Sequence, residues 1–221
     1  MPRQPYLPAF QNLNYAIGAS TVRSRNDLMA HVGRCVALWS HVDEQVGVLF
    51  GVLMGAGTVV ALEVFLTLRA SGKQVEALQA AAQQHLNAEE SKVFGALLSR
   101  YRRLEKERNA LAHGVFGIFE QDSSLLCWIE QKHHVQFITA VLPALTKGIA
   151  GSEPHKMLKE HLFVYRDTDL AQIYEEMDEF YWAIFNLNCY LRDSTSAAGA
   201  TCYGKLKALS WIDAALVING Q

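Results

Sequence analysis

The sequence predicts a mainly α protein: an antiparallel helical bundle of four or five long helices, with a small β-hairpin or sheet inserted before the last long helix. Two observations lead to this fold class. Apolar residues recur alternately three and four positions apart over several long segments, which is the period of a helix buried on one face. No proline occurs between residues 9 and 142, so that stretch contains no residue that breaks a helix interior.

Composition limits the classes of protein to consider. The chain has 221 residues, of which 50% are hydrophobic and 19% charged, which excludes a disordered or fibrous protein and is typical of one globular domain. Twenty Lys and Arg against 22 Asp and Glu give a net charge of −2. Since no global basic field exists, a nucleic-acid partner would need a local basic patch.

Cysteine usage and the N-terminal residues indicate a reducing setting. Cys35, Cys127, Cys189 and Cys202 form no C-x-x-C pair and have no zinc-finger spacing, so we expect no metal and no cofactor. The first residues lack the apolar core of a signal peptide. We therefore expect a cytoplasmic protein.

Three regions are expected along the chain. Residues 1–23 read as an N-terminal extended arm, and residues 24–192 as the helical bundle with its β insertion at about 115–166. Residues 193–221 read as a C-terminal loop and short helix. The sequence has no internal repeat.

The first long helix has the clearest pattern. Its apolar stripe consists of Leu28, Val32, Cys35, Trp39, Val42, Val46, Leu49 and Leu53. Ser24 and Asn26 are candidate N-caps, and a turn is expected at residues 55–57 because of its two glycines. Residues 58–70 predict a second helix, which Ser71 and Gly72 break, and Ser71 is the candidate cap of a continuation through residue 86.

Asn87 is the candidate cap of the next long helix, with Glu89 and Glu90 in the first turn, where acids suit the helix dipole. Its stripe consists of Phe94, Leu97, Tyr101, Leu104 and Leu111. Gly114 follows the helix, as glycine often does at the residue after a C-cap.

The middle of the chain changes to strand-like runs. Residues 115–120 and 125–131 predict a hairpin, 135–141 and 162–165 predict further strands, and 143–160 an irregular loop. Asp167 or Thr168 is the candidate cap of the last long helix, whose stripe runs from Leu170 to Leu191. A loop at 193–204 and a terminal helix at 206–218 complete the prediction.

One stretch approaches the length of a membrane span. Residues 45–62 carry no charge, but four glycines interrupt them and acidic residues flank them at Asp43, Glu44 and Glu63. We interpret the stretch as a buried helix end followed by a turn and expect no membrane partner. A membrane-associated bundle is the alternative.

The motif with chemical content lies at the end of the second long pattern. It reads Arg108-Asn109-Ala110-Leu111-Ala112-His113-Gly114 and follows a basic helix end. This stretch resembles the HEPN superfamily, helical-bundle domains whose hallmark is Arg, four to six residues, then His. It is similar to the Arg-Asn-x-x-Ala-His-Gly form of bacterial members. The loose spacing also occurs from Arg25 to His31 and from Arg34 to His41, so the context distinguishes the match.

The resemblance implies a metal-independent endoribonuclease of the toxin–antitoxin or phage-defence kind, which cleaves RNA through a 2′,3′-cyclic phosphate. His113 would be the general base or acid, Arg108 would hold the scissile phosphate, and Asn109 would position it. A basic patch that binds RNA would be supplied by Arg100, Arg102, Arg103 and Lys106. The implied partners are a second copy of the chain, RNA and an antitoxin protein.

Helix geometry bears on this motif. Arg108 and His113 are five residues apart, about 140° around a helix, whereas Asn109 and His113 are four apart and share a face. One straight helix therefore does not direct Arg108 and His113 at the same phosphate. A dimer in which two motifs form one composite cleft fits this geometry.

The alternative interpretation is a non-catalytic helical module that binds a nucleotide or a protein. In that case the motif is structural at a dimer interface: His113 bonds the terminal carbonyls of its helix, and Arg108 pairs with a carboxylate such as Glu105. A di-iron bundle needs two Glu-x-x-His motifs, and residues 130–133 supply one. Because His133 and His134 are expected in a hairpin, they would face opposite sides and make poor joint ligands.

Overall fold

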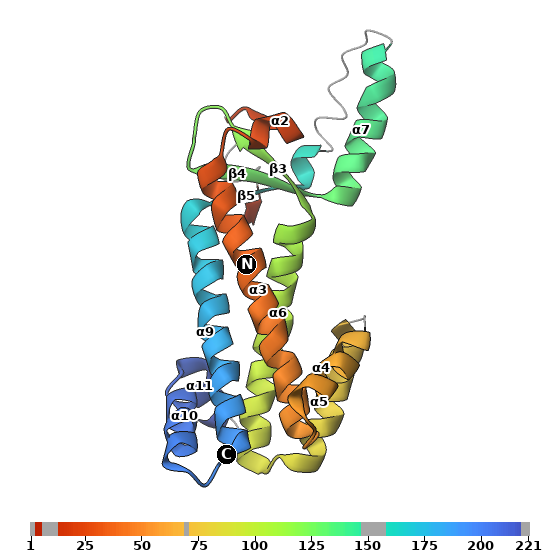
Figure 1. Cartoon of the computed structure of the whole chain (residues 1–221). Helices are drawn as coiled ribbons and strands as arrows, with labels where there is room; N and C mark the ends of the chain where they lie inside the picture. The colour runs from red at the N-terminus through yellow and green to blue at the C-terminus, as the bar shows by residue number, and fades with distance from the viewer. Residues whose placement is uncertain (1–2, 6–12, 69–70, 147–157, 218–221) are drawn as a thin grey trace. The chain divides into compact units, whose positions relative to one another are not determined.

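The computed structural model describes residues 3–5, 13–68, 71–146 and 158–217 (Figure 1). Helices make up most of these residues, and the described strands form one five-stranded antiparallel sheet. The prediction of a mainly α bundle with a small β insertion is therefore confirmed.

The chain divides into two compact units, which are described separately. The first comprises Met1–Ala37 and Lys106–Glu175, and the second Leu38–Glu105 and Glu176–Gln221. Three long helices contribute residues to both units: α3 (Asn26–Leu53), α6 (Ala88–His113) and α9 (Asp167–Arg192).

The sheet of the first unit has the strand order β1-β5-β4-β3-β2. Its strands are β1 (Gln4–Pro5), β2 (Tyr15–Ile17), β3 (Gly114–Phe119), β4 (Leu125–Glu130) and β5 (Leu162–Arg166). The predicted hairpin is present as β3 and β4, and the predicted strand at 162–165 as β5. The N-terminal region is more than an extended arm, because it supplies β1, β2 and the short helix α2 (Ala19–Val22).

Strand β4 is covered on both faces, which explains its continuous apolar sequence. Cys127 and Ile129 lie in one cluster with Leu158, on the face against which Phe137 packs. Glycine is needed at position 117 of β3, because a Cβ there would lie 2.3 Å from the carbonyl oxygen of Ala16. The neighbouring strands therefore approach each other more closely than a side chain would allow.

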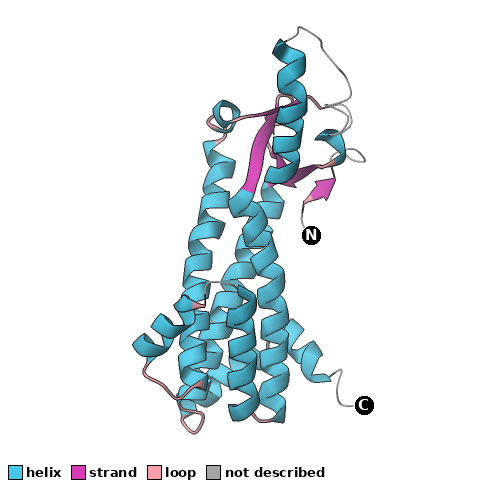
Figure 2. Cartoon of the chain, turned by 90° about the vertical axis from the view of Figure 1, so that its right-hand side faces the viewer, coloured by secondary structure: helices cyan, strands magenta, loops and turns pink. Residues whose placement is uncertain are grey.

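The strand predicted at 135–141 is wrong, since these residues lie in α7 (Gln131–Thr146), visible beside the sheet in Figure 2. Its partly buried residues are His133, His134, Phe137 and Val141, which recur at helical spacing. Packing of Phe137 against the sheet overrides the strand preference of the β-branched residues. His133 and His134 are thus on a helix, not in a hairpin, and most of the loop predicted at 143–160 lies outside the described residues.

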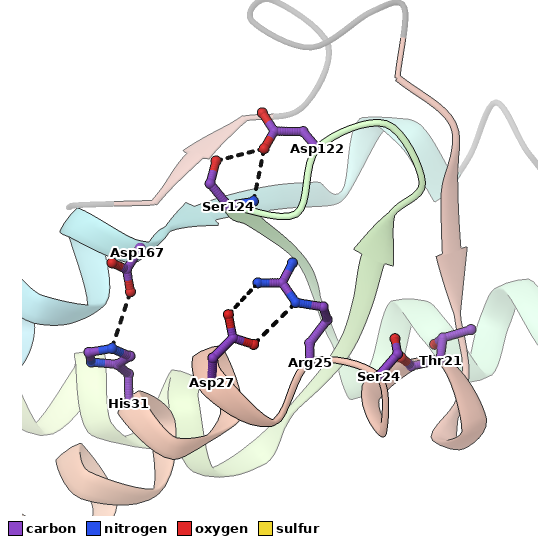
Figure 3. A network of polar contacts seen from close by, with 8 residues as sticks. All are labelled: Thr21, Ser24, Arg25, Asp27, His31, Asp122, Ser124 and Asp167. Carbon is purple, nitrogen blue, oxygen red and sulfur yellow. Dashed lines mark hydrogen bonds and ion pairs between the residues drawn. The ribbon is translucent and has the colours of Figure 1, made fainter.

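Polar contacts in the first unit surround the first residues of α3 and α9 (Figure 3). The Arg25 guanidinium pairs with Asp27 at 2.7 Å, and His31 Nε2 lies 3.2 Å from Asp167. Ser24, a predicted cap, instead donates its hydroxyl to the carbonyl oxygen of Thr21, and the other, Asn26, is the first residue of α3. The predicted N-cap of α3 is therefore wrong.

The cap of α9 also differs from the prediction. The carboxylate of Asp169, rather than a side chain at 167 or 168, accepts the main-chain N–H of Arg166 at 2.8 Å. It also accepts two hydrogen bonds from the Arg166 guanidinium. One buried carboxylate thus serves both the helix end and the adjacent cation.

The second unit contains α4 (Thr58–Thr67), α5 (Ser71–His85), α10 (Ala197–Lys207) and α11 (Ser210–Val217) together with parts of the long helices. Tyr101 links three of them: its ring stacks on Trp39 with centroids 5.3 Å apart and lies 6.1 Å from Phe180. All eight residues of the first predicted stripe are at most 5% exposed, which confirms that pattern.

Asn87 caps α6 as predicted. Its Oδ1 accepts the N–H of Glu90 at 2.9 Å, and Glu90 Oε2 accepts the N–H of Asn87 at 2.8 Å. This reciprocal pair is a capping box, which satisfies two N–H groups that the helix leaves without partners.

The predicted C-terminal loop is partly wrong, because α10 begins at Ala197. Ser196 caps it by accepting the N–H of Gly199 at 2.9 Å.

The uncharged stretch 45–62 is not one helix, since α3 ends at Leu53 and α4 begins at Thr58. Among the described helices, none combines the length and apolar character needed to cross a bilayer.

Candidate functional site

The last two turns of α6 present one polar face to a pocket in the first unit. Lys106, Asn109, Ala110 and His113 are spaced three, one and three residues apart, so their side chains project on the same side of the helix. All four line a pocket of about 340 Å³. The side chains of Lys106, Asn109 and His113 are exposed to solvent.

The sheet supplies the remaining walls of this pocket. The lining residues outside α6 are Arg3, Gly114, Trp128, Glu130, Gln131 and Lys132. Gly114 pairs with Glu130 in the β3–β4 register, so the residue after His113 lies opposite the end of β4. The strand pairing thereby brings Glu130 and Lys132 to the end of α6. We name this site the α6 pocket.

A hydrogen bond fixes the helix end against the sheet. The indole nitrogen of Trp128 donates to the main-chain oxygen of Ala110 at 2.9 Å. A Cβ on residue 114 would lie 1.7 Å from that nitrogen, so the bond requires glycine there. Gly114 was predicted for a helix terminus, but its φ is not positive. Its function in the fold is close approach, not a left-handed conformation.

Arg3, the residue before β1, also lines the α6 pocket. Its guanidinium lies 4.2 Å from the ring centroid of Trp128, and its Nη1 donates to the hydroxyl of Tyr165 at 3.3 Å. Burial raises the pKa of Tyr165 to about 12, so that hydroxyl stays neutral near pH 7. The positive charge of Arg3 is therefore not neutralised by Tyr165.

The charge of the α6 pocket is positive on balance. Lys132 Nζ lies 2.7 Å from Glu130 Oε2, and this hydrogen bond holds the pKa of Glu130 below its usual range. Three cations, Arg3, Lys106 and Lys132, face the single carboxylate of Glu130 among the lining residues. The pocket therefore suits an anionic ligand such as a phosphate.

Arg108 does not line the α6 pocket. It is partly buried, and the helix continues without a break to His113, so Arg108 and His113 project about 140° apart. One chain therefore brings Asn109, His113 and Lys106 together but leaves Arg108 on another face.

The other predicted basic residues belong to the second unit and have acidic or polar partners. Arg100 Nη2 lies 3.0 Å from Glu179, and Arg103 pairs with Glu176. Arg102 Nη2 donates to Gln79 Oε1 at 3.4 Å. Burial lowers the pKa of Arg100, whose guanidinium also lies over the ring of Trp211. These contacts reduce the free positive charge that the sequence suggested for this stretch.

Sequence reasoning missed Arg3, Trp128 and Lys132 as site residues. The predicted hairpin carried a signal for Lys132, because a turn at 121–124 brings residue 130 close to residue 114. Arg3 had no such signal, since the strand that follows it pairs Gln4 with Val164 across most of the chain.

No protein-family model, no curated protein and no solved structure matches the chain. Within the described residues, no group of three His, Cys, Asp or Glu side chains is close enough to hold a metal ion.

Proposed function

We propose that the chain is a HEPN-like, metal-independent endoribonuclease that binds RNA in the α6 pocket. The observation that carries the proposal is the convergence of exposed His113 and Asn109 with three cationic side chains in one pocket. A histidine beside a cationic phosphate site is what cleavage through a ribose 2′-hydroxyl requires.

In this mechanism Lys106 and Arg3 hold the scissile phosphate. His113 takes the proton from the 2′-hydroxyl as its oxygen attacks phosphorus, and the bond from phosphorus to the 5′-oxygen breaks. The leaving 5′-oxygen takes a proton from solvent water and His113 returns its proton to solvent, so the products are a 2′,3′-cyclic phosphate and a 5′-hydroxyl. Asn109 donates its amide to a phosphate oxygen.

Arg108 enters the mechanism from a second copy of the chain. Because it projects away from the pocket of its own chain, a homodimer would bring the Arg108 of one copy to the His113 of the other. Its guanidinium would offset the charge that develops on phosphorus in the transition state. An antitoxin protein that covers the α6 pocket would control such an enzyme.

The test is cleavage of a mixed RNA pool in EDTA, read from the appearance of 2′,3′-cyclic phosphate ends. We expect the wild type to cleave and His113→Ala to be inactive while retaining the wild-type unfolding curve. His85→Ala is the matched control, because His85 is also exposed in the last turn of a helix, α5. A wild type that releases no cyclic phosphate contradicts the proposal.

The dimeric site has its own test. Arg108→Ala and His113→Ala are each expected to be inactive, whereas their mixture should recover part of the activity. Recovery is expected because a mixed dimer retains one Arg108 and one His113 from different copies. Activity of Arg108→Ala alone, or no recovery on mixing under conditions of subunit exchange, contradicts the composite cleft.

A second candidate is a non-catalytic module that binds a nucleotide or a protein. The partial burial of Arg108 and the acidic partners of Arg100 and Arg103 favour it. RNA binding that depends on Lys106 without any cleavage would support this candidate.

A further inference from the structure

Two cysteines in the second unit are brought together by a pair of tyrosines. The rings of Tyr190 on α9 and Tyr203 on α10 stack with centroids 4.1 Å apart and planes at 18°. Cys189 and Cys202 are the residues immediately before these tyrosines. The two thiols are close enough that Cys202 raises the pKa of Cys189.

Hydrogen bonds to α6 hold the two tyrosines in position. The Tyr190 hydroxyl donates to Glu90 Oε1 at 2.8 Å, and the Tyr203 hydroxyl donates to Glu89 Oε1 at 3.1 Å. Lys207 Nζ, on the same helix as Tyr203, lies 3.2 Å from Glu89 Oε1. Because adjacent glutamates anchor both tyrosines, the two cysteines keep their relative position.

The four cysteines fall into two classes of accessibility. Cys35 and Cys127 are 0% exposed, and burial raises their pKa values to about 11 and about 12. Cys189 and Cys202 are partly exposed. Only partly exposed thiols can meet a dissolved oxidant without unfolding of the chain.

We propose that Cys189 and Cys202 are a site of reversible oxidation to an intrachain disulfide, with a low-molecular-weight disulfide such as oxidised glutathione as the oxidant. This site is independent of the α6 pocket and of the proposed nuclease activity.

The reaction proceeds by two thiol–disulfide exchanges. The Cys202 thiolate attacks one sulfur of the small disulfide, and the other sulfur leaves as a thiolate. Cys189 then loses its proton to solvent and attacks Cys202 Sγ, which releases the second small thiolate. Two protein thiols are oxidised and one small disulfide is reduced to two thiols.

The roles of the two sulfurs follow from their environment. Burial and the neighbouring Cys202 raise the pKa of Cys189 above its usual range. Cys189 therefore keeps its proton more readily than a thiol of ordinary pKa, which leaves Cys202 as the sulfur that attacks first. The second exchange is favoured because the two residues are already adjacent.

The test incubates the reduced full-length chain with oxidised glutathione at a series of ratios to reduced glutathione. Free thiols are then alkylated and the peptides are mapped by mass spectrometry. We expect a peptide pair joined through Cys189 and Cys202, while Cys35 and Cys127 react with the alkylating reagent only after unfolding. Separate glutathione adducts on Cys189 and Cys202, or two free thiols when free glutathione is fully oxidised, would overturn the proposal.

Two variants define the exchange. Cys189→Ser should stop the reaction at a glutathione adduct on Cys202, and reduction should release that adduct. Tyr203→Ala should lose most of the linked peptide at a ratio where the wild type is fully linked, because the stacked pair sets the position of the thiols. An unchanged fraction of linked peptide in Tyr203→Ala would show that the stacked tyrosines do not bring the cysteines together.

Discussion

The indole nitrogen of Trp128 donates a hydrogen bond of 2.9 Å to the main-chain oxygen of Ala110. The last carbonyl groups of a helix have no partner within the helix. A buried side chain of strand β4 supplies one here, at 2% exposure. The contact fixes the helical turn that carries Asn109 and His113, so it connects the sheet to the geometry of the α6 pocket.

Trp128→Phe should destabilise the chain. The substitution keeps an aromatic ring but removes the hydrogen bond to the partly buried Ala110, which costs about 0.5–1.5 kcal/mol. The measurement is the free energy of unfolding in urea. Trp182→Phe is the control, because Trp182 is 51% exposed and its change should stay within about 0.5 kcal/mol. Equal effects of the two substitutions would contradict the capping role of Trp128.

Gly114→Ala and Gly95→Ala should change stability in opposite directions, although Gly95 lies within α6 and Gly114 directly follows that helix. A Cβ at residue 114 overlaps the Trp128 indole, and overpacking of this kind costs about 1–3 kcal/mol. A Cβ at residue 95, inside α6, meets no atom within 4 Å. Alanine there should stabilise the helix by about 0.5–1 kcal/mol. Thermal unfolding of both variants checks the pair, and stabilisation by Gly114→Ala would contradict the close approach.

Helical periodicity made the long helices predictable, but it did not identify α7 or α10. The eight-residue stripe of α3 and the Asn87 cap of α6 follow from local sequence, because burial and capping repeat at fixed spacing. The helix α7 was missed because its β-branched residues favour a strand in isolation. The helix α10 was missed because Ala197–Lys207 has few large apolar residues, although Ser196 carried a capping signal.

The candidate site was predictable only where it lies on one helix. Asn109 and His113 share a face by their spacing alone, whereas Trp128 and Arg3 reach the α6 pocket through strand pairings. β1 and β2 are two and three residues long and pair with distant partners, so no local pattern reveals them.

Replacement of Lys106 by alanine should reduce the salt dependence of RNA binding. Each phosphate contact to single-stranded RNA contributes about −0.7 to the slope of log K against log salt concentration. Lys106→Ala should therefore make the slope less steep by about 0.7, measured by fluorescence anisotropy. Lys73→Ala is the matched control, since Lys73 is an exposed lysine of α5 paired with Glu76. A slope that does not change in Lys106→Ala would exclude a phosphate contact at that residue.

The bond between Tyr190 and Glu90 predicts a loss of stability at high pH. Its hydrogen bond to Glu90, with burial, raises the pKa of Tyr190 from 10.0 to about 12. A raised pKa in the folded state means that the contribution is complete below about pH 10 and is lost as the pH rises through about 12. The difference in free energy of unfolding between wild type and Tyr190→Phe should therefore shrink across this range. A difference that stays constant would contradict the shift.

The strand order of the sheet has a consequence for synthesis of the chain on the ribosome. Gln4 pairs with Val164, so the first strand to be made waits for the last before it has a partner. Until β5 emerges, the β4 edge on that side has no neighbour, and Arg3 has no Tyr165 to contact. The α6 pocket therefore lacks one of its walls in every nascent chain that ends before β5.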